Sequence, residues 1–232
     1  MIFNADFHVH SCLSPCADLT MTPNEIGARL KKAKVNWVSI TDHNSCGNLP
    51  VFEKVLKKYD VALLAGIEVQ TREEVHVLVY FKNVEMAQSF SKEVEKHLPH
   101  FRNDPERFGY QLFVNETDKF IGMEDKILSA SINLSIKELW SLSRKYDVLF
   151  VYAHADRKFG VIKQLGFIPQ NPPFDAIEIV GKEIKGVKKP ILKSSDAHFL
   201  DQIRKPFIKV KANNPTFDEL KKALKRKEVW LL

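Results

Sequence analysis

Short apolar runs recur along the chain, and amphipathic segments separate them. A short, continuous apolar run is typical of a strand that is covered on both faces. We predict such strands at residues 2–8, 35–41, 61–65, 75–81, 148–153, 174–180, 190–194 and 207–210, and residues 229–232 either return to the sheet or cover the core.

Helices are predicted between these strands, and three of them have start signals. In each, a serine or threonine stands three positions before a glutamate, as in a capping box, and Pro23 takes the first helical position of one. The signals are Thr22-Pro23-Asn24-Glu25, Ser135-Ile136-Lys137-Glu138 and Thr216-Phe217-Asp218-Glu219. The predicted helices are residues 22–34, 51–59, 84–98, 135–146 and a last segment from Thr216.

Alternating strands and helices, with polar residues after the strands, favour an α/β barrel whose site lies at the carboxyl ends of parallel strands. A doubly wound open sheet is the alternative. The rhythm changes between residues 84 and 134, where a helix and a hairpin at 110–121 are predicted without a candidate ligand set. We interpret residues 84–134 as an insertion, positioned to cover the site, within a single domain of residues 1–232.

The first strand carries the earliest chemical signal. Asp6, His8 and His10 alternate along it, and alternate side chains of an extended strand point to one face. Two imidazoles in this arrangement can bind one metal ion. A surface strand with scattered histidines is the alternative, although the chain has only 8 histidines in 232 residues.

Further imidazoles and carboxylates follow the later strands. Mixed shells of this kind suit zinc, iron or manganese, and the set is too large for one ion, so we expect two or three divalent metals. Multinuclear sites hydrolyse phosphate esters well, because a bridging water becomes hydroxide near neutral pH. No nucleotide-binding glycine loop competes with this interpretation. The candidate ligands are His8, His10, Asp18, His43, Glu68, His76, His154, Asp196 and His198.

Composition narrows the class of protein. A content of 44% hydrophobic and 28% charged residues, without a leader-like start or an apolar run of about 20 residues, predicts a cytoplasmic globular protein with no membrane partner. Cys12, Cys16 and Cys46 are expected to be free thiols. A soft-metal role is their alternative, because each lies close in sequence to a candidate ligand. Nothing in the sequence indicates an oligomeric state.

The formal net charge of +6 comes largely from lysine, which is concentrated in residues 182–193 and 221–227. Positive potential favours an anionic phosphate-ester substrate and also attracts nucleic acid. Residues 221–227 are predicted to form the solvated face of a helix, with Leu220 and Leu224 on its buried side. Nucleic acid is therefore an alternative partner and is not the favoured one.

Six motifs, in order, resemble those of the polymerase and histidinol phosphatase (PHP) superfamily and span residues 6 to 198. The resemblance implies a distorted seven-stranded (β/α) barrel that holds up to three metals at its C-terminal face. The motifs are Asp6-Phe7-His8-Val9-His10-Ser11, Ile40-Thr41-Asp42-His43, Gly66-Ile67-Glu68, His76-Val77-Leu78, Ala153-His154 and Ser195-Asp196-Ala197-His198.

The resemblance also implies how the ligands are shared. Several family members have histidine where Asp18 stands, and aspartate there resembles the branch of small phosphoesterases. We expect a weaker third metal as a result. The implied sets are His8, His10, Glu68 and Asp196 around one metal; Glu68 as a bridge to a second, with His76 and His154; and Asp18, His43 and His198 around a third.

Other polar residues flank the ligands. Arg157 resembles the family's phosphate-binding arginine, and its planar fork suits phosphate oxygens; a surface arginine is the alternative. Lys158 and Ser11 are further substrate-binding candidates, and a turn role is equally open for Ser11. Asp6 and Asp42 are expected to orient imidazoles, with turn capping as the alternative for Asp42.

The leading hypothesis is a metal-dependent phosphoesterase in which metal-bound hydroxide attacks a small phosphorylated metabolite or a nucleotide. Glu68, Asp196 and Arg157 are its predicted catalytic residues. Histidinol-phosphatase-like and exonuclease activities are alternatives within this class. A noncatalytic, metal-stabilised module that binds a phosphorylated or protein partner is the alternative outside it.

Overall fold

The computed structural model describes residues 1–181, 184 and 186–232, so Lys182 and Lys185 of the first lysine-rich segment lie outside it. Within the described residues, the framework is a set of eleven strands. They are β1 (Ile2–Val9), β2 (Trp37–Ile40), β3 (Ala62–Gln70), β4 (His76–Phe81), β5 (Leu112–Val114), β6 (Phe120–Met123), β7 (Val148–Tyr152), β8 (Ala176–Glu178), β9 (Ile191–Leu192), β10 (Ile208–Lys211) and β11 (Val229–Leu231).

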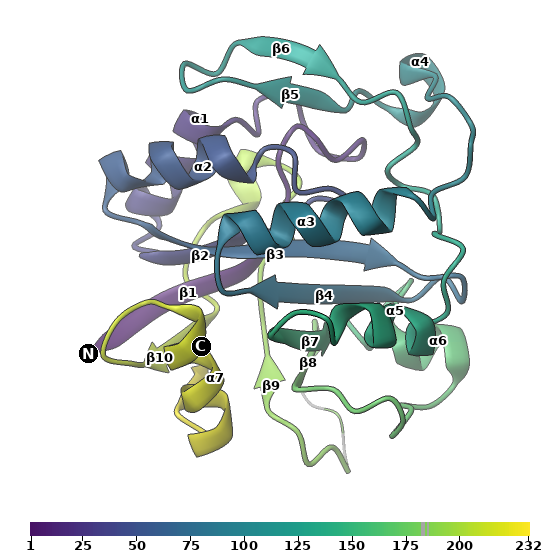
Figure 1. The fold of residues 1–232 in the computed structure, drawn as a ribbon. Helices are drawn as coiled ribbons and strands as arrows, with labels where there is room; N and C mark the ends of the chain where they lie inside the picture. The colour runs from purple at the N-terminus through teal and green to yellow at the C-terminus, as the bar shows by residue number, and fades with distance from the viewer. Residues whose placement is uncertain (182–183, 185) are drawn as a thin grey trace.

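Nine strands form one sheet in the order β11-β10-β1-β2-β3-β4-β7-β8-β9. The edge strands β11 and β9 approach each other, so the sheet curls into a nearly closed barrel (Figure 1). The chain thus has the α/β barrel architecture that the sequence predicted.

The barrel is mixed rather than wholly parallel. β1, β2 and β3 run parallel, as do β7, β8 and β9, but β4 is antiparallel to both of its neighbours. The connection from β3 to β4 spans only residues 71–75, whereas a parallel crossover needs about a dozen residues or more. β10 is also antiparallel to β1 and β11. The expectation of a parallel barrel is therefore wrong for these strands.

The helices are α1 (Pro23–Lys32), α2 (Leu49–Val55), α3 (Val84–Glu95), α4 (Pro105–Phe108), α5 (Ile136–Ser143), α6 (Val161–Leu165) and α7 (Phe217–Arg226), with 3₁₀ turns η1 (Leu56–Tyr59) and η2 (Leu200–Gln202). Among those described, none is long and apolar enough to cross a membrane. The sequence did not predict α4 or α6, which are both short.

The predicted helix starts differ in their caps. The capping box of Ser135 and Glu138 is present at α5, and Thr216 accepts a hydrogen bond from the backbone of Glu219 at α7. Thr22 makes no cap bond at α1, and its buried hydroxyl has no partner among the described residues. Pro23 in the first turn, with its fixed φ, is the start signal that remains there.

Residues 84–134 combine two parts. Helix α3 packs against β3 and β4 with Phe90 in the main core, whereas β5 and β6 form a separate two-stranded sheet (Figure 1). The segment is tied to the loop that follows β2. Asn44 donates to the carbonyls of Leu128 and Ala130, at 2.7 and 2.9 Å, and Asn48 donates to the carbonyl of Leu112 at 3.0 Å.

The first strand changes face inside its ligand motif. Phe7 packs in a cluster with Ala5 and α7, but Val9 packs in the second cluster, which lies under α1, α2 and α3. The register between β1 and β2 shifts between Asp6 and Val9, as expected for a bulge. His8 therefore shares a face with His10, and the prediction that Asp6 shares that face is wrong.

Strand β3 continues through Gly66, beyond the predicted strand end at residue 65. A β-carbon at Gly66 would lie 2.4 Å from Ser39 Oγ and 3.0 Å from Tyr80 Cδ1. Glycine is thus required here by close packing between strands and not by a turn. The unbroken strand carries Glu68, which is buried, to the rim of the barrel.

Candidate metal centre

Eight of the nine predicted ligands gather at one rim of the barrel, where the parallel strands end. β4 runs in the opposite direction, so its first residue, His76, lies at the same rim as residues that follow other strands. All except His198 are buried. The eight are His8, His10, His43, Glu68, His76, His154, Asp196 and His198.

Glu68 lies at the centre of this group. Its two carboxylate oxygens contact five imidazoles that come from four strands and the loops after them. The distances are 3.2 Å from Oε1 to His8 Nε2, 2.9 Å to His76 Nδ1 and 3.1 Å to His154 Nε2, and 3.0 Å from Oε2 to His43 Nδ1 and 3.4 Å to His10 Nε2.

Asp196 joins the cluster from the loop after β9. Its Oδ1 lies 3.2 Å from His8 Nε2 and 3.1 Å from His10 Nε2. Both Asp196 and His154 have positive φ angles, of 50° and 23°. Non-glycine residues rarely adopt such angles, and they persist where surrounding contacts hold them. The surrounding packing therefore fixes these two side chains in place at an energetic cost.

Three subsets bring one ligand atom from each residue within 4.8 Å of the others. Buried imidazole nitrogens and carboxylate oxygens at this spacing fit zinc, manganese or iron. The subsets share members, as expected for a multinuclear centre and not for separate sites. They are His8, His10 and Glu68; His43, Glu68 and His76; and His10, His43 and His198.

The electrostatics of the cluster favour cations. Burial lowers the pKa of His8 and His10, but the nearby carboxylates of Asp196 and Glu68 outweigh it. The pKa of His8 is raised well above its ordinary value, and that of His10 is raised to about 9. For Glu68, burial opposes ionisation, yet the surrounding histidines hold its pKa well below its ordinary value. Positive charge is thus stabilised beside these carboxylates.

The pKa values of His43, His76 and His198 shift in different directions according to their surroundings. Burial lowers the pKa of His43, but Glu68 and Cys16 raise it to about 9. His76 and His198 behave in the opposite way, because burial and neighbouring histidines lower their pKa values to about 4 and about 3. Neutral imidazoles are ready to bind a metal without releasing a proton.

Glu178 is a buried site residue that the sequence reasoning missed. Its Oε2 lies 2.9 Å from His8 Nδ1 and accepts a hydrogen bond from the backbone N–H of His154 at 3.0 Å. A carboxylate on the second ring nitrogen fixes the orientation of a metal-binding histidine. The one available signal was a charged residue within the apolar run Ala176-Ile177-Glu178-Ile179.

A buried hydroxyl network supports His10 from the other side. Ser14 Oγ lies 2.8 Å from His10 Nδ1 and donates to Asp42 Oδ1 at 2.6 Å. Ser11 donates to Asp42 Oδ2 at 2.6 Å and is fully buried, so its hydroxyl does not face a substrate. Asp42 thus acts through Ser14, and Ser11 supports Asp42 instead of binding substrate as predicted.

Asp6 stabilises the backbone near the cluster. Its buried Oδ1 accepts hydrogen bonds from the backbone N–H of Ser195 at 3.0 Å and of His8 at 3.5 Å. Burial raises the pKa of Asp6 to about 6. Asp6 therefore joins the first strand to the loop that carries Asp196, and it does not contact an imidazole in the described hydrogen bonds.

Asp18 does not enter the described ligand subsets. Its Oδ1 accepts hydrogen bonds from the backbone and side chain of Thr20, at 2.8 and 2.5 Å, which lower its pKa. Only its backbone N–H reaches the cluster, donating to the carbonyl of His198 at 2.8 Å. A local turn competes here for the carboxylate, and the Asp-x-Thr pattern was its sequence signal.

Arg157 and Lys158 lie at the mouth of the cluster. The guanidinium of Arg157 pairs with Asp196 and is 45% exposed, so it is accessible to a substrate. Lys158 Nζ lies 4.8 Å from the centre of the Phe159 ring, which stacks on His76 at 4.9 Å. Both cations therefore lie near the site, and their contact with an anion stays a prediction.

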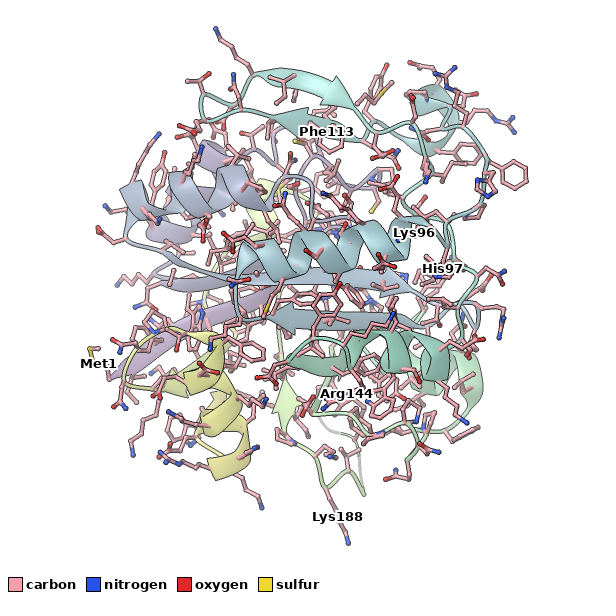
Figure 2. The ribbon with its side chains drawn as sticks, in the orientation of Figure 1. Met1, Lys96, His97, Phe113, Arg144 and Lys188 are labelled. Atoms are coloured by element: carbon pink, nitrogen blue, oxygen red, sulfur yellow. The ribbon has the colours of Figure 1, made fainter. Side chains whose placement is uncertain are left out.

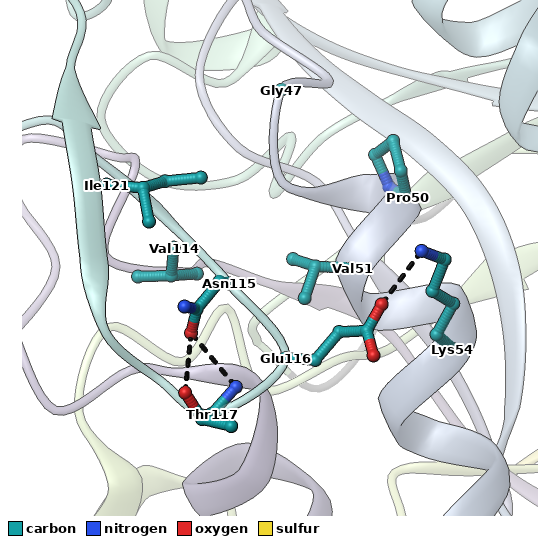
Figure 3. Close-up of a pocket in the computed structure, with 9 residues that line it drawn as sticks. All are labelled: Gly47, Pro50, Val51, Lys54, Val114, Asn115, Glu116, Thr117 and Ile121. Atoms are coloured by element: carbon teal, nitrogen blue, oxygen red, sulfur yellow. Dashed lines mark hydrogen bonds and ion pairs between the residues drawn. The ribbon is translucent and has the colours of Figure 1, made fainter.

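A cavity of about 510 Å³ lies away from this centre. It is between α2 and the β5–β6 hairpin, with Val51 and Ile121 on its walls, and the Lys54–Glu116 ion pair spans its edge at 2.8 Å (Figure 3). None of the predicted site residues lines it.

The two lysine-rich segments meet at the opposite end of the barrel. A cavity of about 280 Å³ there is next to Leu149 at the start of β7 and Pro190 before β9. In Figure 2, Lys188 extends away from the protein at this end. The lysines that line this cavity therefore form no cationic path into the metal centre. Those lining the cavity are Lys188, Lys189, Lys221, Lys225 and Lys227.

Solved structures share this fold. Endonuclease Q from Pyrococcus furiosus aligns with a TM-score of 0.73 and 21% identity over 97% of this chain. Endonuclease Q in complex with a 27-mer duplex that has an abasic lesion at the active site aligns with a TM-score of 0.72 and 22% identity. This chain covers 56% and 57% of those two chains, so it spans little more than half their length.

A protein described as a metal-dependent phosphoesterase from Bifidobacterium adolescentis aligns over 96% of both chains, with a TM-score of 0.54 and 15% identity. No curated protein matches the sequence. The PHP domain model matches residues 6–147, which is more than half of the chain and includes five of the eight clustered ligands. The chain therefore belongs to the PHP domain family.

Proposed function

We propose that the protein is a metal-dependent hydrolase of phosphoester bonds. The observation that carries this proposal is the contact of one buried carboxylate, Glu68, with five imidazoles. A carboxylate in this position is suited to bridge metal ions, and the family assignment supports the same conclusion.

The proposed sets follow the resemblance to the PHP superfamily, and the contacts of Glu68 support them. We assign His8, His10, Glu68 and Asp196 to one metal, and Glu68, His76 and His154 to a second. His43 and His198 belong to a third. Divalent metals bound there would polarise phosphoryl oxygens and lower the pKa of a bound water. Zinc, manganese and iron all suit these ligands.

The residues of the chain itself bind and orient the substrate. Arg157 presents a planar guanidinium at the mouth of the site, where it can hold two phosphate oxygens. Lys158 adds a second positive charge at the mouth. Glu178 and Ser14 keep the rings of His8 and His10 in fixed orientations.

The test is hydrolysis of a panel of phosphate monoesters and diesters by chelated protein and by the same protein reloaded with zinc, manganese or iron. We expect tightly bound metal in the purified protein and activity only after reloading. A protein that holds no metal and leaves every ester intact would refute the proposal. Metal binding without turnover would instead support a noncatalytic module.

Nucleic acid is a second candidate substrate, because endonuclease Q, which shares the fold, was solved with abasic DNA at its active site. The position of the lysine cavity, opposite the metal centre, does not favour it. Cleavage of an abasic duplex, compared with an intact duplex and a small diester, distinguishes the two substrate classes.

The cytoplasmic location stays a prediction from the sequence.

A further inference from the structure

The third ligand group, His10, His43 and His198, contains imidazoles only. Its three nitrogens provide no negative charge of their own, and a divalent ion normally takes at least one further donor. Asp18, the predicted partner of His43 and His198, is instead hydrogen-bonded to Thr20. Another side chain near these histidines is therefore needed to complete the group.

The loop after β1 approaches all three histidines, and Cys16 lies in the middle of the approach. Ser14, two residues before it, contacts the ring of His10 and accepts from the backbone N–H of His43 at 3.1 Å. Asp18, two residues after it, donates its backbone N–H to the carbonyl of His198. Because contacts on both sides fix this turn, the position of Cys16 beside the group is fixed as well.

The side chain of Cys16 interacts with His43, because Cys16 is one of the groups that raise the pKa of this buried histidine. Cys16 is exposed, so an ion from solvent can reach its sulfur, whereas Cys12 and Cys46 are buried. Burial raises the pKa values of Cys12 to about 12 and of Cys46 above its ordinary range.

We propose that Cys16, and not Asp18, is the fourth donor of the group formed by His10, His43 and His198, and that this group selects a thiophilic ion such as Zn²⁺. When the ion binds, the Cys16 S–H bond breaks, the proton passes to solvent, and the sulfur donates its electron pair to the metal. The inference rests on the metal binding of the proposed function, but it concerns this one group only.

The test uses protein loaded with Co²⁺, since a cobalt–thiolate bond has a charge-transfer band in the near ultraviolet. We expect the band in the wild-type protein and in Cys12→Ser and Cys46→Ser, and its loss in Cys16→Ser with one bound ion fewer. Asp18→Asn should keep both the band and the ion. A band that survives Cys16→Ser, or is absent from metal-loaded wild type, overturns the inference while the other metals stand.

A second readout needs no variant. We expect Zn²⁺ to protect Cys16 from alkylation in the wild-type protein, as mapped by mass spectrometry, with unchanged labelling of Cys12 and Cys46. Equal labelling of Cys16 with and without Zn²⁺, in protein shown to contain the metal, refutes the inference. Failure of the protein to bind any metal would refute the proposed function as well, so the two failures are distinguishable.

Discussion

Replacing Glu178 tests whether its hydrogen bond to His8 contributes to the stability and the metal affinity of the protein. Glu178→Ala removes the acceptor of two buried donors, His8 Nδ1–H and the backbone N–H of His154. An orphaned buried donor costs about 1–3 kcal/mol, so the metal-free protein should lose about 2–6 kcal/mol in free energy of unfolding. Loss of such support typically weakens metal affinity by about 10–100-fold.

Glu178→Gln separates shape from charge. The glutamine carbonyl can still accept both hydrogen bonds, but the negative charge beside His8 is removed. We therefore expect a smaller loss of stability than in Glu178→Ala, with an intermediate metal affinity. The exposed Glu53 on α2 provides the control, since Glu53→Ala removes a carboxylate without a buried partner.

The assay is urea unfolding of the metal-free variants, combined with metal affinity from competition with a chelator. Nitrogen NMR of the histidines adds an independent readout, because the Nδ1–H of His8 should lose its hydrogen bond and exchange faster with solvent in Glu178→Ala. The reasoning is refuted if Glu178→Ala unfolds at the same urea concentration as Glu53→Ala and binds metal as tightly as the wild type.

Three further predictions test other parts of the site. Arg157→Ala should reduce kcat/KM for a phosphate ester by about 10–150-fold, because a hydrogen bond to a charged group contributes about 1.5–3 kcal/mol. The metal content should stay unchanged. Loss of metal would contradict the role of Arg157 in substrate binding. Ser14→Ala leaves His10 Nδ1 and Asp42 without their shared hydroxyl. Urea unfolding should therefore show that the free energy of unfolding falls by about 1–3 kcal/mol. An unchanged free energy of unfolding would contradict a stabilising role of this hydrogen-bond network. The pKa values of His10 and His43 are raised to about 9 in the metal-free protein, so both are protonated at pH 7 and must release protons to bind a metal. The metal affinity should therefore rise from pH 7 to about 9 and then level off. A metal affinity that does not change over that pH range would contradict these pKa shifts.

The ligands could be predicted from the sequence because they follow apolar runs, and the ends of parallel strands meet at one rim. His154 and Asp196 are examples of this pattern. The position of His76 at this rim also depends on the antiparallel direction of β4, because His76 begins its strand. The short connection 71–75 is consistent with that direction. The barrel fold and the family were accessible for the same reason, since ordered motifs at strand ends imply both.

The supporting residues could not be predicted in this way, because they depend on contacts between distant segments. Glu178 is 170 positions from His8, and its neighbourhood shows only a charged residue in an apolar run, without indicating the partner. The β1 bulge, which removes Asp6 from the face of His8, depends on pairing with β2. Asp18 is a local case, where a turn with Thr20 engages the carboxylate first.

The most direct test of the central claim is the metal content and phosphoester hydrolysis of Glu68→Gln, measured in the same samples as the wild type. A glutamine keeps the size of the side chain but cannot contribute the charge that five imidazoles contact. We predict loss of at least one bound metal and a fall in kcat of more than about 100-fold, beyond the effect of a supporting residue. Full metal content with near-normal hydrolysis would contradict the assignment of Glu68 as the centre of the site.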